Sequence, residues 1–211
     1  MSRTATVVVV LASSYIAAQV LADVASLRII EVAGVTMDGG TLIYPFTFTL
    51  RDLIHKVAGI GAARVLIFTA AAINVLMALL FAAVAALPAD LEVGPQPEFG
   101  MVLAPVIRIV VASIVAEVLS ELIDTEVYRM WVGRFAERWQ WGRVLTSNAV
   151  AVPIDSVVFS VLAFGGAVPA GAVMAIIWGN ILVKGLVTAV SVPWIYFVRG
   201  QAATTVPAGQ S

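Results

Sequence analysis

The chain contains no cysteine and little charge. With no Cys among its 211 residues, it cannot form disulfides, thiolate nucleophiles or Cys-ligated metal sites. A single histidine, His55, is too few for a histidine metal cage, and its place beside Lys56 favours a polar residue at a helix end. A net charge of −1 offers no basic face to nucleic acid. We therefore expect no metal, no cofactor and no nucleic acid among its ligands.

Catalytic motifs are also missing from the sequence. It has no glycine-rich phosphate-binding loop, no Gly-x-Ser-x-Gly turn and no His-Glu-x-x-His pair. We therefore do not expect an enzyme. Because no ATPase domain is recognisable either, active transport by this chain would depend on an ion gradient or on a separate partner.

Apolar residues are what the chain has in excess. They make up 61% of it and charged residues 12%, against about 45–50% and about 25% in a soluble domain. A bilayer can solvate so much apolar surface, whereas water cannot. The N-terminal stretch resembles a signal peptide, but its apolar run continues to about Ala22 without a small-residue cleavage site, so we interpret it as a first span. We expect one transmembrane domain over 1–200 and a disordered polar tail over 201–211.

Apolar segments long enough for membrane helices recur along the chain. About 20 apolar residues cross the hydrocarbon core. The second segment is the weakest, because it contains Pro45, Arg51 and Asp52, and it is either a short spanning helix or a re-entrant one covered by protein. The pattern predicts an all-α integral membrane protein, a bundle of six transmembrane helices at about 5–27, 41–59, 62–87, 101–127, 144–166 and 170–198.

The connections between these segments carry an orientation signal. The loop from Pro88 to Gly100 has three acids and no Lys or Arg, whereas basic residues fall on alternate connections and near the two ends of the chain. The positive-inside rule then places both termini in the cytoplasm, in a bacterial inner membrane. The basic positions are Arg3, Lys56, Arg64, Arg129, Arg134, Arg138, Arg143 and Arg199, and Trp131, Trp139 and Trp141 lie in the most basic loop, as interfacial aromatics do.

Two opposite charges stand near the middle of the last two spans. An ionisable residue at a helix centre costs about 2.5–3.5 kcal/mol to insert, so it needs a partner. Asp155 and Lys184 can neutralise each other, either as a structural ion pair or as a pair that a ligand or a proton opens. Asn148 lies on the face of Asp155, seven residues earlier, and Asn180 lies one turn before Lys184.

The fourth segment carries three acids on one face. Glu117, Glu121 and Asp124 are spaced i, i+4, i+7, so cations, protons or hydrogen-bond donors must meet them. The alternative is that Glu121 and Asp124 lie at headgroup level and pair with arginines of the following loop. Arg108 lies roughly opposite Glu117 around the helix, where it either snorkels outward or pairs elsewhere.

The first two segments add polar and aromatic candidates. Gln19 can hydrogen-bond deep in the bundle, while Asp23, four residues later, lies nearer the interface. The rings of Tyr44, Phe46 and Phe48 can pack in the core or stack on a flat ligand. Asp52 has Lys56 and Arg64 within reach. Embedded acids outnumber embedded bases, which favours a donor-rich ligand, a cation or a proton-coupled cycle over an anion.

Taken in order along the chain, these residues resemble the queuosine precursor transporters. The similarity covers nearly the whole sequence, although Asp23 stands where family members often carry an amide. The similar positions are Gly40 to Asp52, Gly59, Ala63, Arg64, Arg108, Asp124 to Tyr128, Arg143, Ser147, Asn148, Asp155, Ser156, Phe159 to Gly165, Asn180, Lys184, Pro193 and Tyr196.

The resemblance implies a six-helix secondary transporter that imports 7-deazaguanines for queuosine salvage into tRNA. Its substrates would be 7-cyano-7-deazaguanine, 7-aminomethyl-7-deazaguanine and, as a further candidate, queuine; a homodimer is left open. Asp155 or Glu117 would accept from the adjacent N–H donors of the guanine-like edge. Asn148 and Asn180 would bind its carbonyl and ring nitrogens. Its flat ring would lie against one or more of Tyr44, Phe46, Phe48 and Phe159.

Three other functions compete with this interpretation. A substrate-binding subunit of an energy-coupling-factor vitamin transporter is also a small six-helix protein, and Ala18 and Ala22 match its Ala-x-x-x-Ala docking motif. A membrane enzyme would need Glu117, Glu121 and Asp124 to hold a divalent metal. A purely structural or assembly protein would not explain the number of central charges.

Overall fold

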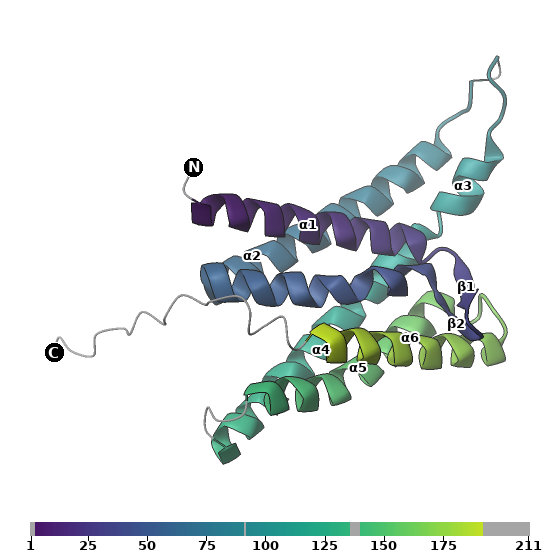
Figure 1. Cartoon of the computed structure of the whole chain (residues 1–211). Coiled ribbons are helices and arrows are strands. Elements are labelled where there is room, and N and C mark those ends of the chain that lie inside the picture. The colour runs from purple at the N-terminus through teal and green to yellow at the C-terminus, as the bar shows by residue number, and fades with distance from the viewer. Residues whose placement is uncertain (1–2, 91, 136–139, 192–211) are drawn as a thin grey trace.

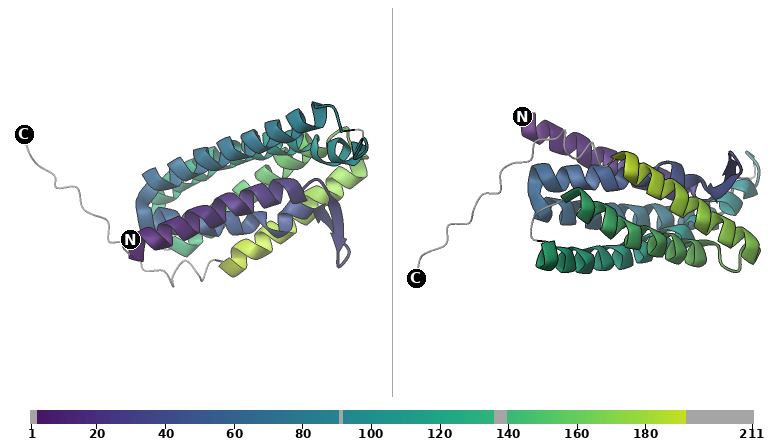
Figure 2. Two further views of the ribbon diagram at one scale, coloured as in Figure 1. Left: turned by 90° about the horizontal axis from the view of Figure 1, so that it is seen from above. Right: turned by 60° about the horizontal axis from the view of Figure 1, so that its bottom comes forward.

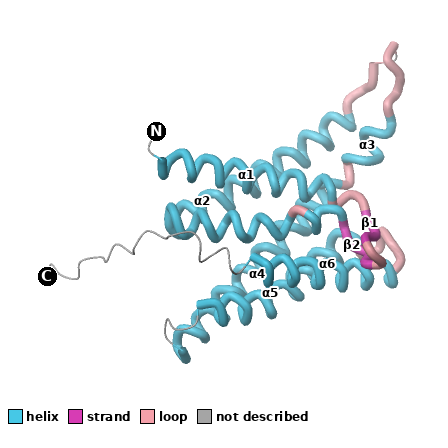
Figure 3. The backbone as a smooth tube through the Cα atoms, in the orientation of Figure 1, coloured by secondary structure: helices cyan, strands magenta, loops and turns pink. Residues whose placement is uncertain are grey.

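The computed structural model describes residues 3–90, 92–135 and 140–191. The helices form one bundle in which the second half of α2 and α4 run obliquely to α1 and α6, and a small β-hairpin lies at one end (Figure 1, Figure 3). Along the chain the elements are α1 (Arg3–Ala25), β1 (Ile29–Val32), β2 (Val35–Asp38), a 3-10 helix η1 (Gly39–Leu42), α2 (Tyr44–Ala86), α3 (Pro97–Leu103), α4 (Val106–Phe135), α5 (Gln140–Phe164) and α6 (Ala170–Ser191).

A bend at Gly59 divides α2 into two halves that run in opposite directions (Figure 2). Gly59 has φ 87° and ψ 171°, a conformation that is nearly restricted to glycine because it has no Cβ. The first half, 44–58, returns alongside α1, and Pro45 at its start costs no intrahelical hydrogen bond. The weak second segment is therefore helical over most of its predicted length.

The bundle has two distinct ends (Figure 2). The β-hairpin, the α2–α3 connection and the α5–α6 turn lie at one end, which we name the hairpin end. The bend of α2 and the start of α1 lie at the other, which we name the kink end, and α6 runs toward it. Two of the basic residues in the predicted orientation signal lie at the kink end. Arg3 begins α1, and Arg64 lies shortly after the bend of α2.

Four of the described helices are long and apolar enough to cross a membrane. They cover Thr4–Ala25, Gly61–Ala86, Pro97–Ser120 and Ala170–Val187, while the apolar part of α5, Asn148–Phe164, is shorter. Their outer surface carries exposed large side chains such as Phe68, Leu76 and Trp178, as expected where a helix faces lipid. The mostly helical fold is confirmed, these four helices are consistent with a membrane protein, and the count of six crossings stays a prediction.

The β-hairpin departs from the all-α expectation. Strand β1 pairs with β2 in an antiparallel register that sets Val32 opposite Val35. The two turn residues, Ala33 and Gly34, both have positive φ, as a type I′ hairpin turn requires. The sequence predicts only a connection over 28–40, because four-residue strands are too short to show a clear alternation.

The hairpin packs directly on α6. A Cβ at Gly179 would overlap the carbonyl oxygen of Thr36, so the strand can approach the helix this closely only because residue 179 has no side chain.

Some sequence predictions fall outside the part of the chain that the structure describes. They concern the disordered tail, 201–211, and the side chains of the loop tryptophans and arginines from Trp131 to Arg143.

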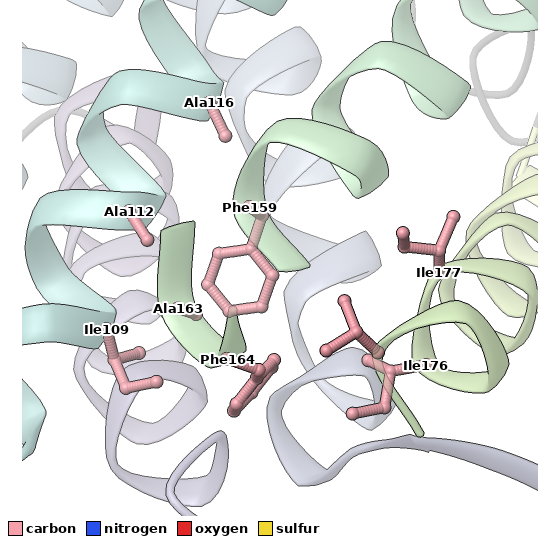
Figure 4. Packing of buried hydrophobic residues seen from close by; sticks show 9 residues of the cluster. Ile109, Ala112, Ala116, Phe159, Ala163, Phe164, Ile176 and Ile177 are labelled. Atoms are coloured by element: carbon pink, nitrogen blue, oxygen red, sulfur yellow. The ribbon is translucent and has the colours of Figure 1, made fainter. Parts of the chain in front are cut away.

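Separate apolar clusters hold the two sides of the bundle. In one, Tyr15 of α1 packs with Ile54 and Leu66 from the two halves of α2. In the other, α4, α5 and α6 meet around Phe159 and Phe164, whose rings lie edge to face at 5.8 Å (Figure 4). The second cluster contains Ile109, Ala112, Ala116, Phe159, Ala163, Phe164, Val173, Ile176 and Ile177.

Candidate functional site

A cavity with polar walls lies within the bundle toward the hairpin end. About 300 Å³ of space between atoms belongs to it when open solvent is included, but the enclosed part is only wide enough for about one water molecule, so a larger ligand would require the walls to move apart. We name it the hairpin-side cavity. Five α-helices, the 3-10 helix η1 and the end of the hairpin contribute to it. Its lining residues are Ala22, Asp23, Ser26, Asp38, Gly40, Thr41, Tyr44, Ser113, Ala116, Asp155, Phe159 and Lys184.

The predicted pair of central charges forms in the wall of this cavity. Lys184 Nζ lies 2.6 Å from Asp155 Oδ2, and the two side chains are only 4% and 3% exposed. The ammonium also lies 4.8 Å from the centre of the Tyr44 ring and 5.7 Å from that of Phe159. A carboxylate and two ring faces therefore surround the buried cation, which is how a protein interior stabilises one.

Asp23 is the carboxylate whose hydrogen bonding is incomplete. It is 1% exposed and lines the cavity, rather than lying at the interface as expected from the sequence. Ser113 Oγ donates to its Oδ1 at 2.8 Å. Its Oδ2 has no hydrogen-bond partner among the described residues. Leaving a buried carboxylate oxygen without a donor is costly, so this atom can serve a ligand that brings a donor.

Asn180 fastens the hairpin to α6. Its Nδ2 donates to Asp38 Oδ2 at 2.7 Å, and its Oδ1 lies 2.7 Å from the hydroxyl of Thr41. Asp38 also accepts from Ser26 Oγ at 2.7 Å and caps η1 by accepting from Thr41 N. The amide expected to bind substrate is thus used within the protein, between segments far apart in sequence.

Gln19 and Glu117 belong to a second polar chain, between α1 and α4. Gln19 Nε2 donates to the Tyr15 hydroxyl at 3.0 Å, and that hydroxyl donates to Glu117 Oε1 at 3.1 Å. Tyr15 and Gln19 are buried. These hydrogen-bonded residues lie beside the hairpin-side cavity without lining it.

A second cavity, also of about 300 Å³ including its opening, lies toward the kink end. We name it the kink-side cavity. In it the Arg51 guanidinium lies 5.5 Å from the centre of the Phe48 ring. Asn148 and Asp155 share this cavity, as their shared helical face predicts. Its lining residues are Phe48, Arg51, Ser120, Asn148, Ala151, Val152 and Asp155.

Comparison with known proteins places the chain in a family. Residues 38–198, which include every lining residue of the kink-side cavity and most of the hairpin-side one, match the family described as "Putative vitamin uptake transporter". The chain belongs to this vitamin uptake transporter family. It is therefore a multi-pass membrane protein and a transporter.

A curated relative from Bacillus subtilis (strain 168) is named "Probable queuosine precursor transporter". It is 26% identical over 186 residues, which cover 86% of this chain and 80% of the relative. No solved structure matches the chain. The family resemblance read from the sequence is confirmed by these two findings.

The remaining predicted site residues of this transporter do not all line the same cavity. Tyr44 and Phe159 line the hairpin-side cavity and Phe48 the kink-side one, whereas Phe46 is 55% exposed and lines neither. The side chains of Asp52, Glu121 and Asp124 lie outside the described residues. Among the described residues, no three His, Asp or Glu side chains gather as a metal site would require.

Several lining residues were not singled out from the sequence. Ser26, Thr41 and Ser113 are small hydroxyl residues in apolar or turn-like surroundings, where nothing marks them as special. Asp38 had a usable signal, because Asp-Gly-Gly-Thr is the spacing at which an aspartate caps a helix start.

Arg108, for which the sequence allows either an outward position or a partner elsewhere, hydrogen-bonds to backbone carbonyls. Its Nε donates to Leu162 O at 2.8 Å and its Nη2 to Gly165 O, so it satisfies carbonyls at the C-terminal end of α5. Arg108 therefore stabilises the end of a helix and has no part in either cavity.

Proposed function

We propose that this transporter imports queuosine precursors of the 7-deazaguanine class and that the hairpin-side cavity binds them. The observation that carries the proposal is Asp23 Oδ2, which meets no donor in the described part of the chain and faces a cavity bordered by the rings of Tyr44 and Phe159. The relative named for queuosine precursors and the sequence resemblance support the same substrate class.

The guanine-like edge suits Asp23. That edge presents adjacent N–H donors, and a carboxylate accepts with both oxygens. Oδ2 is unmet, and Oδ1 accepts one bond from Ser113 and has a lone pair left. This assignment moves the donor-reading role from Asp155 and Glu117, which already accept from Lys184 and Tyr15, to Asp23.

The other walls of the cavity suit the rest of the ring. Tyr44 and Phe159 offer ring faces for a flat heterocycle, and the Lys184 ammonium, which has three N–H groups and gives one to Asp155, can donate to its carbonyl or a ring nitrogen. An aminomethyl substituent, which carries a positive charge, would also be favoured by nearby carboxylates. The site thus combines acceptors for one edge with donors for the other.

We further propose that the kink end is cytoplasmic, in a bacterial inner membrane, and that an ion gradient drives uptake. The course of α1 and α2 supports this orientation, because Arg3, Lys56 and Arg64 fall at the kink end, whereas the hairpin end has Arg28 and Arg108.

The decisive test is salvage in cells. A bacterial strain that can neither make queuosine precursors nor import them would express this chain, receive nanomolar 7-cyano-7-deazaguanine or its aminomethyl analogue, and be assayed for queuosine in tRNA. We expect queuosine to appear with this chain and not with an empty vector. No queuosine from any precursor, with the protein present in the membrane, would reject this substrate class. Bound small molecules and co-purifying ATPase subunits would then test the energy-coupling-factor alternative.

A further inference from the structure

The hairpin-side and kink-side cavities share one lining residue, Asp155. On α2, the order along the chain from the hairpin end is Tyr44, which lines the first cavity, then Phe48 and Arg51, which line the second. On α4, Ala116 of the first cavity likewise precedes Ser120 of the second. The two cavities therefore follow one another along the bundle axis, and Asp155 lies between them.

α5 repeats this order in the opposite direction. It runs from the kink end, and its lining residues are Asn148, Ala151 and Val152 of the kink-side cavity, then Asp155, then Phe159 of the hairpin-side cavity. Three helices thus agree on where one cavity ends and the other begins.

A compact layer fills the boundary. It consists of the Asp155 carboxylate, the Lys184 ammonium 2.6 Å from it, and the rings of Tyr44 and Phe159 on the cation. All four side chains are buried. From this arrangement we infer that the Asp155–Lys184 pair is a gate between two successive binding positions, and that a ligand passes from one to the other when the pair separates.

The kink-side cavity has the chemistry of a second position for the same class of ligand, a flat polar heterocycle. Phe48 supplies a ring, Arg51 and Asn148 supply donors for a carbonyl, and Asp155 supplies an acceptor for N–H groups once it leaves Lys184. Asp155 therefore exchanges one partner for another as the ligand moves, so that its charge is met on both sides of the step.

α5 has a place to move at this boundary. Pro153 lies inside the helix, two residues before Asp155, and it cannot donate to the carbonyl of Ala149. A helix missing this hydrogen bond bends more readily there. Bending at Pro153 would shift Asp155 relative to Lys184 on α6. The inference rests on transport, which the family shows, and not on the deazaguanine substrate.

The absence of native cysteine allows a direct test with single cysteines. Ala116→Cys reports on the hairpin-side cavity, Ala151→Cys on the kink-side cavity, and Val157→Cys, exposed on the outer face of α5, is the matched lipid-facing control. A small membrane-impermeant thiol reagent is applied to right-side-out and to inverted vesicles. We expect Ala116→Cys and Ala151→Cys to react at least tenfold faster from opposite sides, and the control to react from neither.

The gate itself is tested in the same background with the neutral pair Asp155→Asn and Lys184→Gln. We expect the side preference of both reporters to fall at least fivefold, because the layer no longer holds the cavities apart. If this double variant does not reach the membrane, Tyr44→Ala, which removes a ring from the layer and keeps the ion pair, takes its place with the same expectation.

Two outcomes would overturn the gate. One is that the two reporters react from the same side in the parent; the other is that the side preference survives in the recovered variant. Neither readout requires a substrate. If queuosine salvage fails while the side preference is intact, the substrate is rejected and the gate is kept. If salvage succeeds while the two reporters show no side preference, the gate is rejected and the substrate is kept.

Discussion

Among single residues, the buried carboxylates differ in whether the protein itself satisfies them. Asp155 is paired with Lys184, and the half-buried Glu117 accepts from Tyr15. Asp23 is as buried as Asp155 but retains an oxygen without a partner among the described residues. A buried acceptor without a donor is rare in a folded protein, and a ligand that brings the donor is one explanation for it. Asp23 is therefore the residue at which a change should affect transport most and the fold least.

Asp23→Asn is the sharpest substitution of this kind. Asparagine keeps the size and can still accept from Ser113, but it presents an amide donor or a weaker acceptor to the ligand. Losing a hydrogen bond to a charged group costs about 1.5–3 kcal/mol, or roughly ten- to a hundredfold. We expect queuosine salvage, or uptake of the labelled precursor, to fall by about that factor with the protein level unchanged.

The matched control is Asp90→Asn, the same chemical change at an exposed acid of the α2–α3 connection. It should leave uptake as it is. An Asp23→Asn variant that transports as well as the Asp90→Asn control would remove Asp23 from the site.

At the scale of secondary-structure elements, the β-hairpin packs tightly on α6. Gly179 lets the backbone of Thr36 come close, and Asn180, the next residue, binds Asp38 and Thr41. The hairpin thus meets α6 through one backbone contact and one polar network, both at the rim of the hairpin-side cavity.

Gly179→Ala should push the hairpin away from α6. The new methyl group would overlap the Thr36 carbonyl, and such overpacking costs about 1–3 kcal/mol. We expect a lower melting temperature in detergent and reduced uptake, with the helical circular dichroism unchanged. Gly185→Ala on the same helix meets no neighbour within 4 Å and should be neutral or slightly stabilising. Equal behaviour of the two variants would show that the hairpin does not depend on this contact.

The bend of α2 provides a second matched pair of glycines. Gly59 has a positive φ that an alanine adopts only at a cost of about 1–3 kcal/mol, whereas Gly61 is helical and has open space around it. Gly59→Ala should therefore lower the melting temperature in detergent by several degrees, and Gly61→Ala should not lower it. A Gly59→Ala variant as stable as Gly61→Ala would mean that the two halves of α2 do not turn back at this residue.

In the molecule as a whole, the arrangement of its ends makes a prediction about topology. The first half of α2 returns beside α1, so the hairpin turn and the bend at Gly59 lie at opposite ends of the bundle (Figure 1). This half is not among the helices whose length and composition alone suffice to span a membrane. If this half and the shorter apolar part of α5 both cross, the chain crosses six times.

Reporter proteins fused after glycines in the connections, and after Gly61 beside the bend of α2, would decide whether the first half of α2 crosses the membrane. We expect alkaline phosphatase to be active when fused after Gly34, Gly94 or Gly166, and green fluorescent protein to be bright when fused after Gly61. The hairpin end would then be periplasmic and the kink end cytoplasmic. The same reporter signal after Gly34 and after Gly61 would show that the first half of α2 re-enters and does not cross.

Much of this protein could be predicted from its sequence. The apolar segments predict helices to within a few residues, such as 5–27 for Arg3–Ala25 and a sixth segment starting at Ala170. The pairing of Asp155 with Lys184 also followed from the sequence, because two lone opposite charges deep in apolar helices have no cheaper way to be neutralised. These features depend on local composition and on the cost of burying charge, which can be read along the chain.

Other features were decided only by tertiary structure. Thr41 contacts Asn180, 139 residues away, and Ser113 contacts Asp23, 90 residues away, so no local pattern could show which polar groups satisfy one another. The same holds for the short hairpin, which is ordered by packing on α6. A sequence shows that its embedded acids need partners. Only the packing of the helices determines which buried acid of the described residues, here Asp23, has an oxygen that no donor meets, because hydrogen bonds form between neighbours in space.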